Sequence, residues 1–358
     1  MFLLDRPLRP PYPYFVSPWK RRPEFLRKGG IPMTRKADSA LRFSIPLAFL
    51  IAFMLLGAGL TPAWAAYPDR PIKMIVPWAA GGDTDAIFRV IASAMEKHLG
   101  KPVVIVNITG ASGTVGARET KKAPPDGYTI LSIHDFIHTT YYTGVAELTY
   151  RDFDPVALMT STPSVLAAYG KAPWNNFKEL IEDAKKRPEQ ITMGATMGST
   201  SHFFPAMIAQ AAGVKWKYVS YEGTAPRMTA LLGGHVLLGE TNLTQLDKVK
   251  AGQLKMFAIA TPKRLPEVPD VPTLKELGLD IVYAVNRGIV APKGTPEAAL
   301  AKLEEACARA AKDPAVAEMM KKQGTLVEYL NRKEYAAFFE KNDKINADLA
   351  QALGYKRK

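Results

Sequence analysis

One run of residues, positions 72–89, constrains the fold of this chain more than any other. An apolar stretch leads into Gly81 and Gly82, and apolar residues then recur at helical spacing as far as Gly100. We therefore predict a buried strand, a tight glycine turn and a helix that begins within residues 83–85. Glycines let the main chain approach a ligand closely, and free N–H groups at a helix start attract negative charge. The run thus predicts a main-chain site for an anion.

A second feature concerns the destination of the chain. An apolar segment at residues 43–60 follows Arg35, Lys36 and Arg42 and precedes Ala63-Trp64-Ala65. This order is typical of a secretory signal, so we expect cleavage after Ala65 and a periplasmic protein. A membrane anchor is the alternative, because the segment approaches spanning length. Residues 1–32 show no hydrophobic period, and Met33 would begin a signal of ordinary length. An anion site on an exported protein indicates that the protein binds an acidic small molecule.

Charge and cysteine content narrow the function further. Of the formal charge of +13, residues 1–65 supply +7 and the remaining residues +6. This mild excess suits anionic solutes, whereas nucleic-acid binding would need a concentrated basic face. Cys307 is the only cysteine and lies in an amphipathic run, so we expect a buried structural thiol and no disulfide within the chain.

Strand and helix signals alternate along the rest of the chain. Strands are expected at 103–107, 128–133, 155–162, 165–169, 191–195, 216–221, 236–239, 254–261, 282–285, 288–291 and 325–329. Helices are expected at 114–122, 176–187, 201–212, 225–232, 243–251 and 297–312. Such alternation predicts parallel α/β layers. The pattern restarts near residue 191, which favours two lobes.

These motifs resemble a known family. The pattern Pro77-x-x-Ala80-Gly81-Gly82-x-x-Asp85-x-x-x-Arg89, preceded by Tyr67-Pro-x-x-Pro71-Ile72, is similar to the solute-binding receptors of tripartite tricarboxylate transporters, also called Bug-type receptors. Their second glycine loop resembles Asn107-x-x-Gly110-Ala-Ser-Gly113-x-x-Gly116-Ala117. Further matching motifs follow in the family's order at 125–129, 220–226, 231–236 and 291–296. The likeness covers essentially the whole chain after residue 65.

The resemblance implies an α/β, two-lobe type II periplasmic-binding-protein fold with the ligand cleft between the lobes. We expect an N-terminal extension and signal peptide at 1–65, lobe 1 at 66–162 plus 286–358, and lobe 2 at 163–285. The expected partners are a small organic acid, such as a di- or tricarboxylate, and the membrane permease subunits of the transporter. We expect a monomer that uses no cofactor, binds no nucleic acid and is not an enzyme.

The resemblance and the strand ends together nominate the ligand site. The loops at residues 80–85 and 110–113 would hold one carboxylate through backbone N–H groups, and the loop at 198–202 would contribute from the opposite lobe. The candidate ligand-binding residues are Ala80, Gly81, Gly82, Asp85, Gly110, Ala111, Ser112, Gly113, His134, Asp135, Ser199, Thr200, Ser201, Asn242 and Arg287.

Several of these candidates have a structural alternative. Asp85 either caps the helix or contacts the ligand, and Asp83 is expected to be exposed at the turn. One hydroxyl among residues 199–201 should cap a helix, leaving the others to donate to a carboxylate. Arg287 is either a solvated charge or a cation that grips a second carboxylate in two places. His202 is expected to pack or to orient its loop.

The sequence argues against a metal site and against an enzyme. His134 and His138 are four residues apart, as in some metal sites, but no third ligand has a helpful spacing, so we expect no metal. His134 or Asp135 is instead expected at the pocket mouth. An exported hydrolase would need a nucleophile elbow, and no Gly-x-Ser-x-Gly occurs. A receptor that signals to a membrane kinase would use the same closed cleft and stays open as an alternative.

The chain departs from the family pattern at positions that bear on the ligand. Leu237 and Thr241 stand where the family often has Asp, and Asn286-Arg287 stands where an aromatic residue is frequent. These departures leave the identity of the ligand open.

Overall fold

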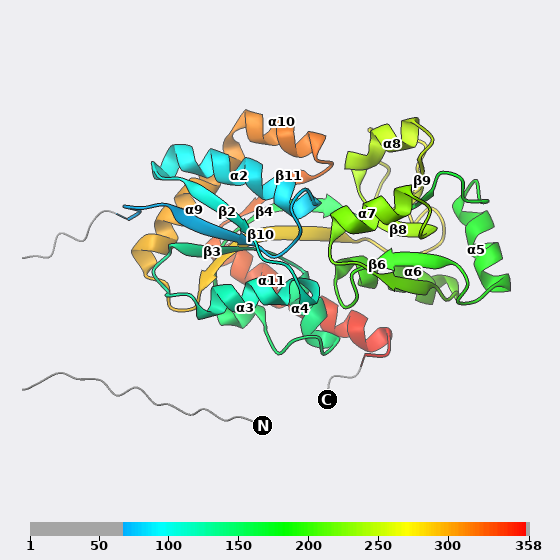
Figure 1. Ribbon diagram of the computed structural model, residues 1–358, viewed down its shortest axis with the longest axis horizontal. Coiled ribbons are helices and arrows are strands. Elements are labelled where there is room, and N and C mark those ends of the chain that lie inside the picture. The colour runs from blue at the N-terminus through cyan, green and yellow to red at the C-terminus, as the bar shows by residue number, and fades with distance from the viewer. Residues whose placement is uncertain (1–66, 356–358) are drawn as a thin grey trace, which may run out of the picture. The chain divides into compact units, whose positions relative to one another are not determined.

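The computed structural model describes residues 67–355 (Figure 1). The expected N-terminal extension, the signal segment and its cleavage site at Ala65 lie outside the described residues. Within residues 67–355, no helix combines the length and the apolar character needed to cross a membrane.

A six-stranded sheet, in the order β11-β4-β10-β3-β1-β2, is the centre of one structural half of the described residues, which we call the first half. Its strands are β1 (Ile72–Val76), β2 (Val103–Asn107), β3 (Thr129–His134), β4 (Phe153–Pro163), β10 (Ala284–Pro292) and β11 (Leu326–Leu330). β1 pairs in parallel with β2 and β3, and β10 runs antiparallel between β3 and β4. The strands are rich in buried Ile, Val and Leu, as expected for a sheet that is covered on both faces.

Helices cover both faces of this sheet (Figure 1). On one side lie α2 (Asp83–Leu99), α9 (Glu297–Lys312) and α10 (Pro314–Lys322). On the other side lie α3 (Thr114–Lys122), α4 (Phe136–Tyr142) and α11 (Arg332–Ala352). Helix α2 has Asp83 and Asp85 in its first turn and ends at Gly100 in the left-handed conformation, as the sequence predicts.

A five-stranded sheet forms the second half, in the order β7-β6-β8-β5-β9. Its strands are β5 (Val165–Tyr169), β6 (Thr192–Ala195), β7 (Lys217–Ser220), β8 (Leu238–Thr241) and β9 (Leu254–Ile259). The helices of this half are α5 (Phe177–Lys186), α6 (Thr200–Ala212), α7 (Thr224–Leu232) and α8 (Leu246–Lys250). Three 3₁₀ turns complete the described chain: η1 (Ala111–Gly113), η2 (Tyr150–Asp152) and η3 (Leu243–Gln245).

The chain crosses between the two sheets at two neighbouring segments. β4 ends at Pro163 and β5 begins at Val165, so a single residue, Ser164, separates the sheets on the way out. The return leads into β10. The Ser164 N–H donates to the carbonyl of Tyr283 at 3.2 Å, and the Ala260 N–H donates to the carbonyl of Ser164 at 2.9 Å. These hydrogen bonds join the two crossing segments.

The predicted α/β class is confirmed, with two differences of detail. Both sheets are mixed rather than parallel, because β10 and β5 run against their neighbours. The strands expected at 282–285 and 288–291 are one strand, β10. The polar pair Asn286-Arg287 looks like a break in sequence, but Asp135 accepts hydrogen bonds from the Asn286 backbone and side chain and holds this stretch in the sheet.

Helix α4 was not predicted. Its sequence consists of aromatic and β-branched residues and one His, types with low intrinsic helix propensity, so tertiary packing decides its conformation. Phe136 and Ile137 are fully buried against the first sheet.

Candidate functional site

A cavity of about 30 Å³ lies between the two halves, beyond the carboxyl ends of β1, β3, β6 and β8. The first half lines it with Trp78, Gly82, Asp83, Thr84, His134, Thr162, Val285 and Arg287. The second half lines it with Thr196, Ser199, Thr200, Ser201, Gly223, Thr224, Arg227, Glu240 and Asn242. Ligands of open α/β sheets bind at this end of the strands. The cavity has room for roughly two water molecules.

The structure brings part of the predicted site together at this cavity. The candidates that line it are Gly82, His134, Ser199, Thr200, Ser201, Asn242 and Arg287. The candidates that do not line it are Ala80, Gly81, Asp85, Gly110, Ala111, Ser112, Gly113 and Asp135. The members of the second group lie close by and have identifiable structural contacts.

Asp85 holds the first glycine turn together. One of its carboxylate oxygens accepts hydrogen bonds from the Gly81 N–H and from Nε of Arg89, both at 2.9 Å. The other accepts from Nδ2 of Asn107 at 2.9 Å. Burial raises the pKa of Asp85, but the hydrogen bonds from Arg89, Gly81 and Asn107 outweigh burial and lower it overall. Asp85 therefore fixes the start of α2 as an anion.

The second glycine loop touches the other half of the molecule. The hydroxyl of Ser112 donates to the carbonyl of Met197 at 2.6 Å, and the Ser112 N–H donates to Oε2 of Glu222 at 3.3 Å. Ala111 and Ser112 both have positive φ angles of 45° and 57°. Ser112 thus links this loop to the second half.

Arg287 places a buried guanidinium at the cavity without an ion-pair partner among the described residues. Its side chain belongs to β10 and the residue is 4% exposed. Nε donates to the hydroxyl of Thr84 at 3.1 Å and Nη1 to the hydroxyl of Thr162 at 2.6 Å. Within residues 67–355, no ion pair involves Arg287.

The environment of this guanidinium is therefore unfavourable for its charge. Burial lowers the pKa of Arg287, and the nearby carboxylates of Asp83, Glu240 and Asp135 only partly offset that effect. A buried charge without a counter-ion in contact is costly, so the site favours an anion that can bind to Arg287.

Arg227 and Glu240 form a second, self-contained charge pair. Nη2 of Arg227 donates to Oε2 of Glu240 at 2.8 Å and to its backbone carbonyl at 3.2 Å. Oε1 of Glu240 accepts from the hydroxyl of Ser164 at 3.0 Å. Burial raises the pKa of Glu240, and the adjacent Arg227 opposes that shift. Nε of Arg227 is buried and has no acceptor among the described residues.

The prediction that Asp83 is exposed at the turn is wrong. It is half-buried, lines the cavity and reaches the second half, where its Oδ2 accepts from Nδ2 of Asn242 at 2.7 Å. No ion pair within residues 67–355 includes Asp83. The hydrogen bond to Asn242 joins the halves across the mouth of the cavity.

The hydroxyl-rich loop of the second half lies where the resemblance implies. Ser199 occupies the N-cap of α6, although its side chain makes no capping hydrogen bond. The hydroxyl of Ser201 accepts from the Thr196 N–H at 3.0 Å and lies 3.2 Å from the hydroxyl of Ser199. Thr200 completes this buried hydroxyl group at the start of a helix, a position suited to hydrogen bonds with an anion.

An aromatic pair closes one wall of the cavity. The Trp78 and His134 rings stack with centroids 5.1 Å apart. Burial, together with the charge of Arg287, lowers the pKa of His134 well below its usual value, so this side chain is neutral at pH 7. Nδ1 of His134 accepts from the Phe136 N–H at 3.1 Å. The indole N–H of Trp78 is buried and has no acceptor among residues 67–355.

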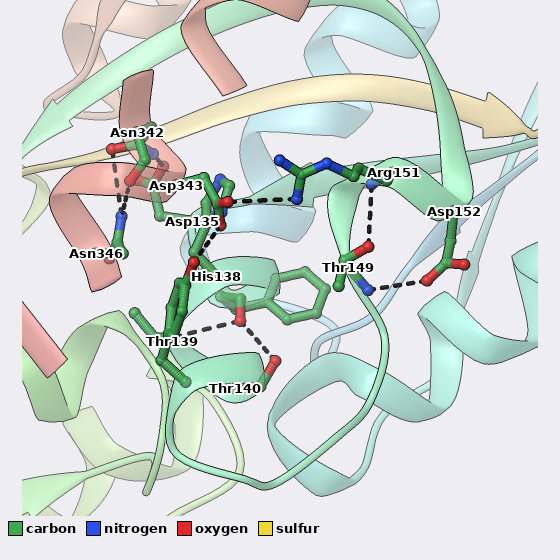
Figure 2. A network of polar contacts seen from close by, with 12 residues as sticks. Asp135, His138, Thr139, Thr140, Thr149, Arg151, Asp152, Asn342, Asp343 and Asn346 are labelled. Atoms are coloured by element: carbon green, nitrogen blue, oxygen red, sulfur yellow. Dashed lines mark hydrogen bonds and ion pairs between the residues drawn. The ribbon is translucent and has the colours of Figure 1, made fainter. Parts of the chain in front are cut away.

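Asp135 lies outside the cavity, in a polar network between α4, β10 and α11 (Figure 2). It accepts from the Asn286 N–H at 2.7 Å and from the Asn342 side chain, and so holds β10 beside Arg287. His138 contacts Asp343 at 3.0 Å in the same network. Across the described residues, no group of three or more His, Cys, Asp or Glu side chains could hold a metal ion.

Sequence reasoning missed part of the cavity lining. Trp78, Thr196 and Glu240 follow or end buried strands, so the strand-end rule that nominated His134 applies to them as well. Thr162 and Val285 end the strands expected at 155–162 and 282–285, and the structure pairs them with each other between β4 and β10.

Comparisons with known proteins show the family to which the chain belongs. Residues 87–355 match the family model of the tripartite tricarboxylate transporter family receptor. A UPF0065 protein from the TAR-I ttuE-ttuC' intergenic region of Agrobacterium vitis is 36% identical over 285 residues, which are 76% of this chain and 82% of that protein. The structure of the periplasmic binding protein BugD is 34% identical, covers 82% of this chain and 100% of that chain, and has a TM-score of 0.75.

A further solved structure is informative about ligands. MatC from Rhodopseudomonas palustris, with bound malate, is 31% identical, covers 79% of this chain and 100% of that chain, and has a TM-score of 0.75. The likeness to these solved binding proteins confirms the fold that the sequence resemblance implies.

Proposed function

Because the chain belongs to the tripartite tricarboxylate transporter receptor family, we propose that it captures a small carboxylated metabolite outside the cytoplasm and delivers it to the permease subunits of such a transporter. Membership confirms the resemblance seen in the sequence. Like the other members of this family, the chain is a binding protein and not an enzyme. We further propose export with cleavage after Ala65 and action as a monomer.

The unpaired, buried guanidinium of Arg287 carries the proposal. It lies in a cavity between two α/β halves, beside the hydroxyls of Thr84 and Thr162. A ligand carboxylate would supply the missing counter-charge, and a planar guanidinium suits bidentate binding of a carboxylate. The related MatC structure holds malate, a carboxylate, which supports this choice of ligand class.

We propose that the two sheets are the cores of two lobes, lobe 1 at 66–162 plus 286–358 and lobe 2 at 163–285. The membership of the strands supports these bounds to within about two residues, since β1–β4, β10 and β11 form one sheet, β5–β9 form the other, β4 ends at Pro163 and β10 begins at Ala284. The ligand would contact Gly82 and Arg287 from lobe 1 and the hydroxyls of residues 199–201 from lobe 2. Asp85, Asp135 and residues 110–113 would position these groups.

A thermal screen with a charge variant tests the proposed function. Carboxylates at one hundred times their dissociation constant should stabilise the protein by about 2.7 kcal/mol and raise its Tm by at least about 2 °C. Neutral sugars and cations should leave the Tm unchanged. Arg287→Ala should weaken binding roughly 30-fold or more, because it removes the counter-charge of the bound carboxylate.

Arg309→Ala is the matched control, since Arg309 is exposed on α9 and pairs with Glu305. This variant should bind as the wild type does. Hits confined to sugars, or unchanged affinity of Arg287→Ala for every carboxylate, would contradict the proposed function.

A further inference from the structure

We propose that the ligand carries a cationic nitrogen as well as a carboxylate, and that the Asp83 carboxylate binds the cationic end. The inference rests on the proposed function and specifies the class of ligand for the same site. It predicts a zwitterionic amino acid in place of the di- or tricarboxylate expected from sequence.

The charge inventory of the cavity is the first support. Four charged side chains line it: Asp83, Arg227, Glu240 and Arg287. Arg227 and Glu240 neutralise each other, and Ser164 occupies the second carboxylate oxygen of Glu240. Once this pair is set aside, one cation and one anion remain, and neither has an ion-pair partner within residues 67–355.

The placement of these two charges is the second support. Thr84, the neighbour of Asp83 in the chain, accepts the hydrogen bond from Nε of Arg287. Asp83 and Arg287 therefore face the cavity from adjoining parts of its wall. Oδ2 of Asp83 accepts from Asn242, and no group in the described chain donates to Oδ1. A ligand with opposite charges a few bonds apart would complement both groups at once.

The alternative ligands fit this inventory less well. A second carboxylate in the cavity would lie near Asp83 and Glu240 and would be repelled by both. An alkyl chain in that position would bury the Asp83 carboxylate without a donor for Oδ1. His134 offers no counter-charge to a second carboxylate, because it is neutral.

Matched ligands of equal carbon number test the proposal by calorimetry on the purified full chain. The four-carbon set is butanoate, succinate, 2-aminobutanoate and 4-aminobutanoate, and the six-carbon set is hexanoate, adipate, 2-aminohexanoate and 6-aminohexanoate. In at least one set, an amino compound should bind at least tenfold more tightly than the simple acid and the diacid.

Asp83→Asn separates the charge of this residue from its contact with Asn242. The new amide keeps an oxygen that can accept the Asn242 hydrogen bond and suits a helix start. The variant should bind the amino compound at least tenfold more weakly, hold the simple acid within about twofold, and bind the diacid more tightly. Asp270→Asn, which removes an exposed carboxylate of the second half, should change none of these affinities.

Asn242→Ala tests whether Asp83 acts only as a link between the halves. In that case Asn242→Ala would weaken all compounds equally and Asp83→Asn would weaken none, which would overturn the proposal. A diacid that binds the wild type more tightly than its amino analogue would overturn it too, while leaving the carboxylate-receptor function intact. Failure of every acid to bind would instead contradict the proposed function itself.

Discussion

Gly81 and Gly82 are adjacent in the chain but meet different requirements. Gly81 has a φ of +77° with nothing near its missing Cβ, so the turn itself needs this glycine. Gly82 has a φ of −79°, which any residue adopts. A Cβ on Gly82 would lie 3.2 Å from the carbonyl oxygen of Ala79, 3.8 Å from the Ala225 nitrogen and 4.0 Å from Cβ of Thr224. Gly82 therefore allows close approach of the second half.

This difference predicts opposite phenotypes for the two positions. Gly82→Val should weaken ligand binding more than tenfold and keep a cooperative unfolding transition, because its side chain would fill the gap between the halves. Gly81→Ala should lower the free energy of unfolding by about 1 kcal/mol, because alanine is strained at positive φ, with affinity held within about threefold. Calorimetry and urea unfolding measure the two effects. Loss of the same property in both variants would contradict this division.

At this scale the sequence predicts only some of the residues that line the cavity. The glycine turn indicated an anion site, and Gly82 lies at the cavity. Asp83 and Asp85 are two positions apart on a helix start and so point about 200° apart. One reaches Asn242 in the second half, whereas the other reaches Asn107 in the first. Choosing between them requires the orientation of α2 relative to a distant sheet, which no local signal contains.

At the scale of single elements, the start of α6 depends on a neutral histidine. His202 is buried in the first helical turn, where its Nδ1 accepts from the Gly198 N–H at 3.3 Å. Its ring stands perpendicular to that of Tyr218, with centroids 4.7 Å apart. Burial lowers the pKa of His202 to about 4. This agrees with the expectation that His202 packs or orients its loop.

The shift of His202 predicts a loss of stability in mild acid. An unfolded histidine takes up a proton below about pH 6.5, whereas folded His202 stays neutral until about pH 4. Stability from this residue is therefore complete above about pH 6.5 and declines as the pH falls towards 4, by about 2 kcal/mol at pH 5. Urea unfolding at pH 7.5 and pH 5 measures it.

Two histidine variants complete this test. His202→Gln should reduce the difference in unfolding free energy between the two pH values by about 2 kcal/mol. His98→Gln, at an exposed position on α2, should leave the difference unchanged. An acid-induced loss of the same size in His202→Gln would show that another group causes it.

The helices and strands also differ in whether local sequence signals or long-range contacts determine them. β2, α3 and α9 have the bounds that the sequence predicts, since local periodicity and stop signals suffice for them. The continuity of β10 across Asn286 and Arg287, and the presence of α4, could not be predicted. Asn286 in β10 is held by Asp135, and α4 lies between the first sheet and α11, so long-range contacts decide both.

At the scale of the whole molecule, hydrogen bonds join the two halves both at the cavity and beside it. Ser112 bonds to Met197 and Glu222, and Asp83 bonds to Asn242. These hydrogen bonds hold the halves together around a cavity with room for roughly two water molecules, so we expect the halves to separate when a ligand enters.

Closure about the ligand predicts a change in overall size. Small-angle scattering should give a smaller radius of gyration with a saturating ligand than without, because the ligand favours the closed state by its differential affinity. Ser112→Ala should weaken binding about fivefold, since it removes one hydrogen bond of the closed state. Ser93→Ala, on the exposed face of α2, is the control. Equal radii with and without a tight ligand would contradict closure.

The contacts of the Ser112 loop also have a kinetic consequence. A molecule bound between closed halves leaves when the halves separate, so the opening rate limits how fast it dissociates. The hydrogen bonds of Ser112 to Met197 and Glu222 lie outside the cavity lining. A membrane partner that competed for these groups would shorten the residence time of the ligand without contacting the ligand.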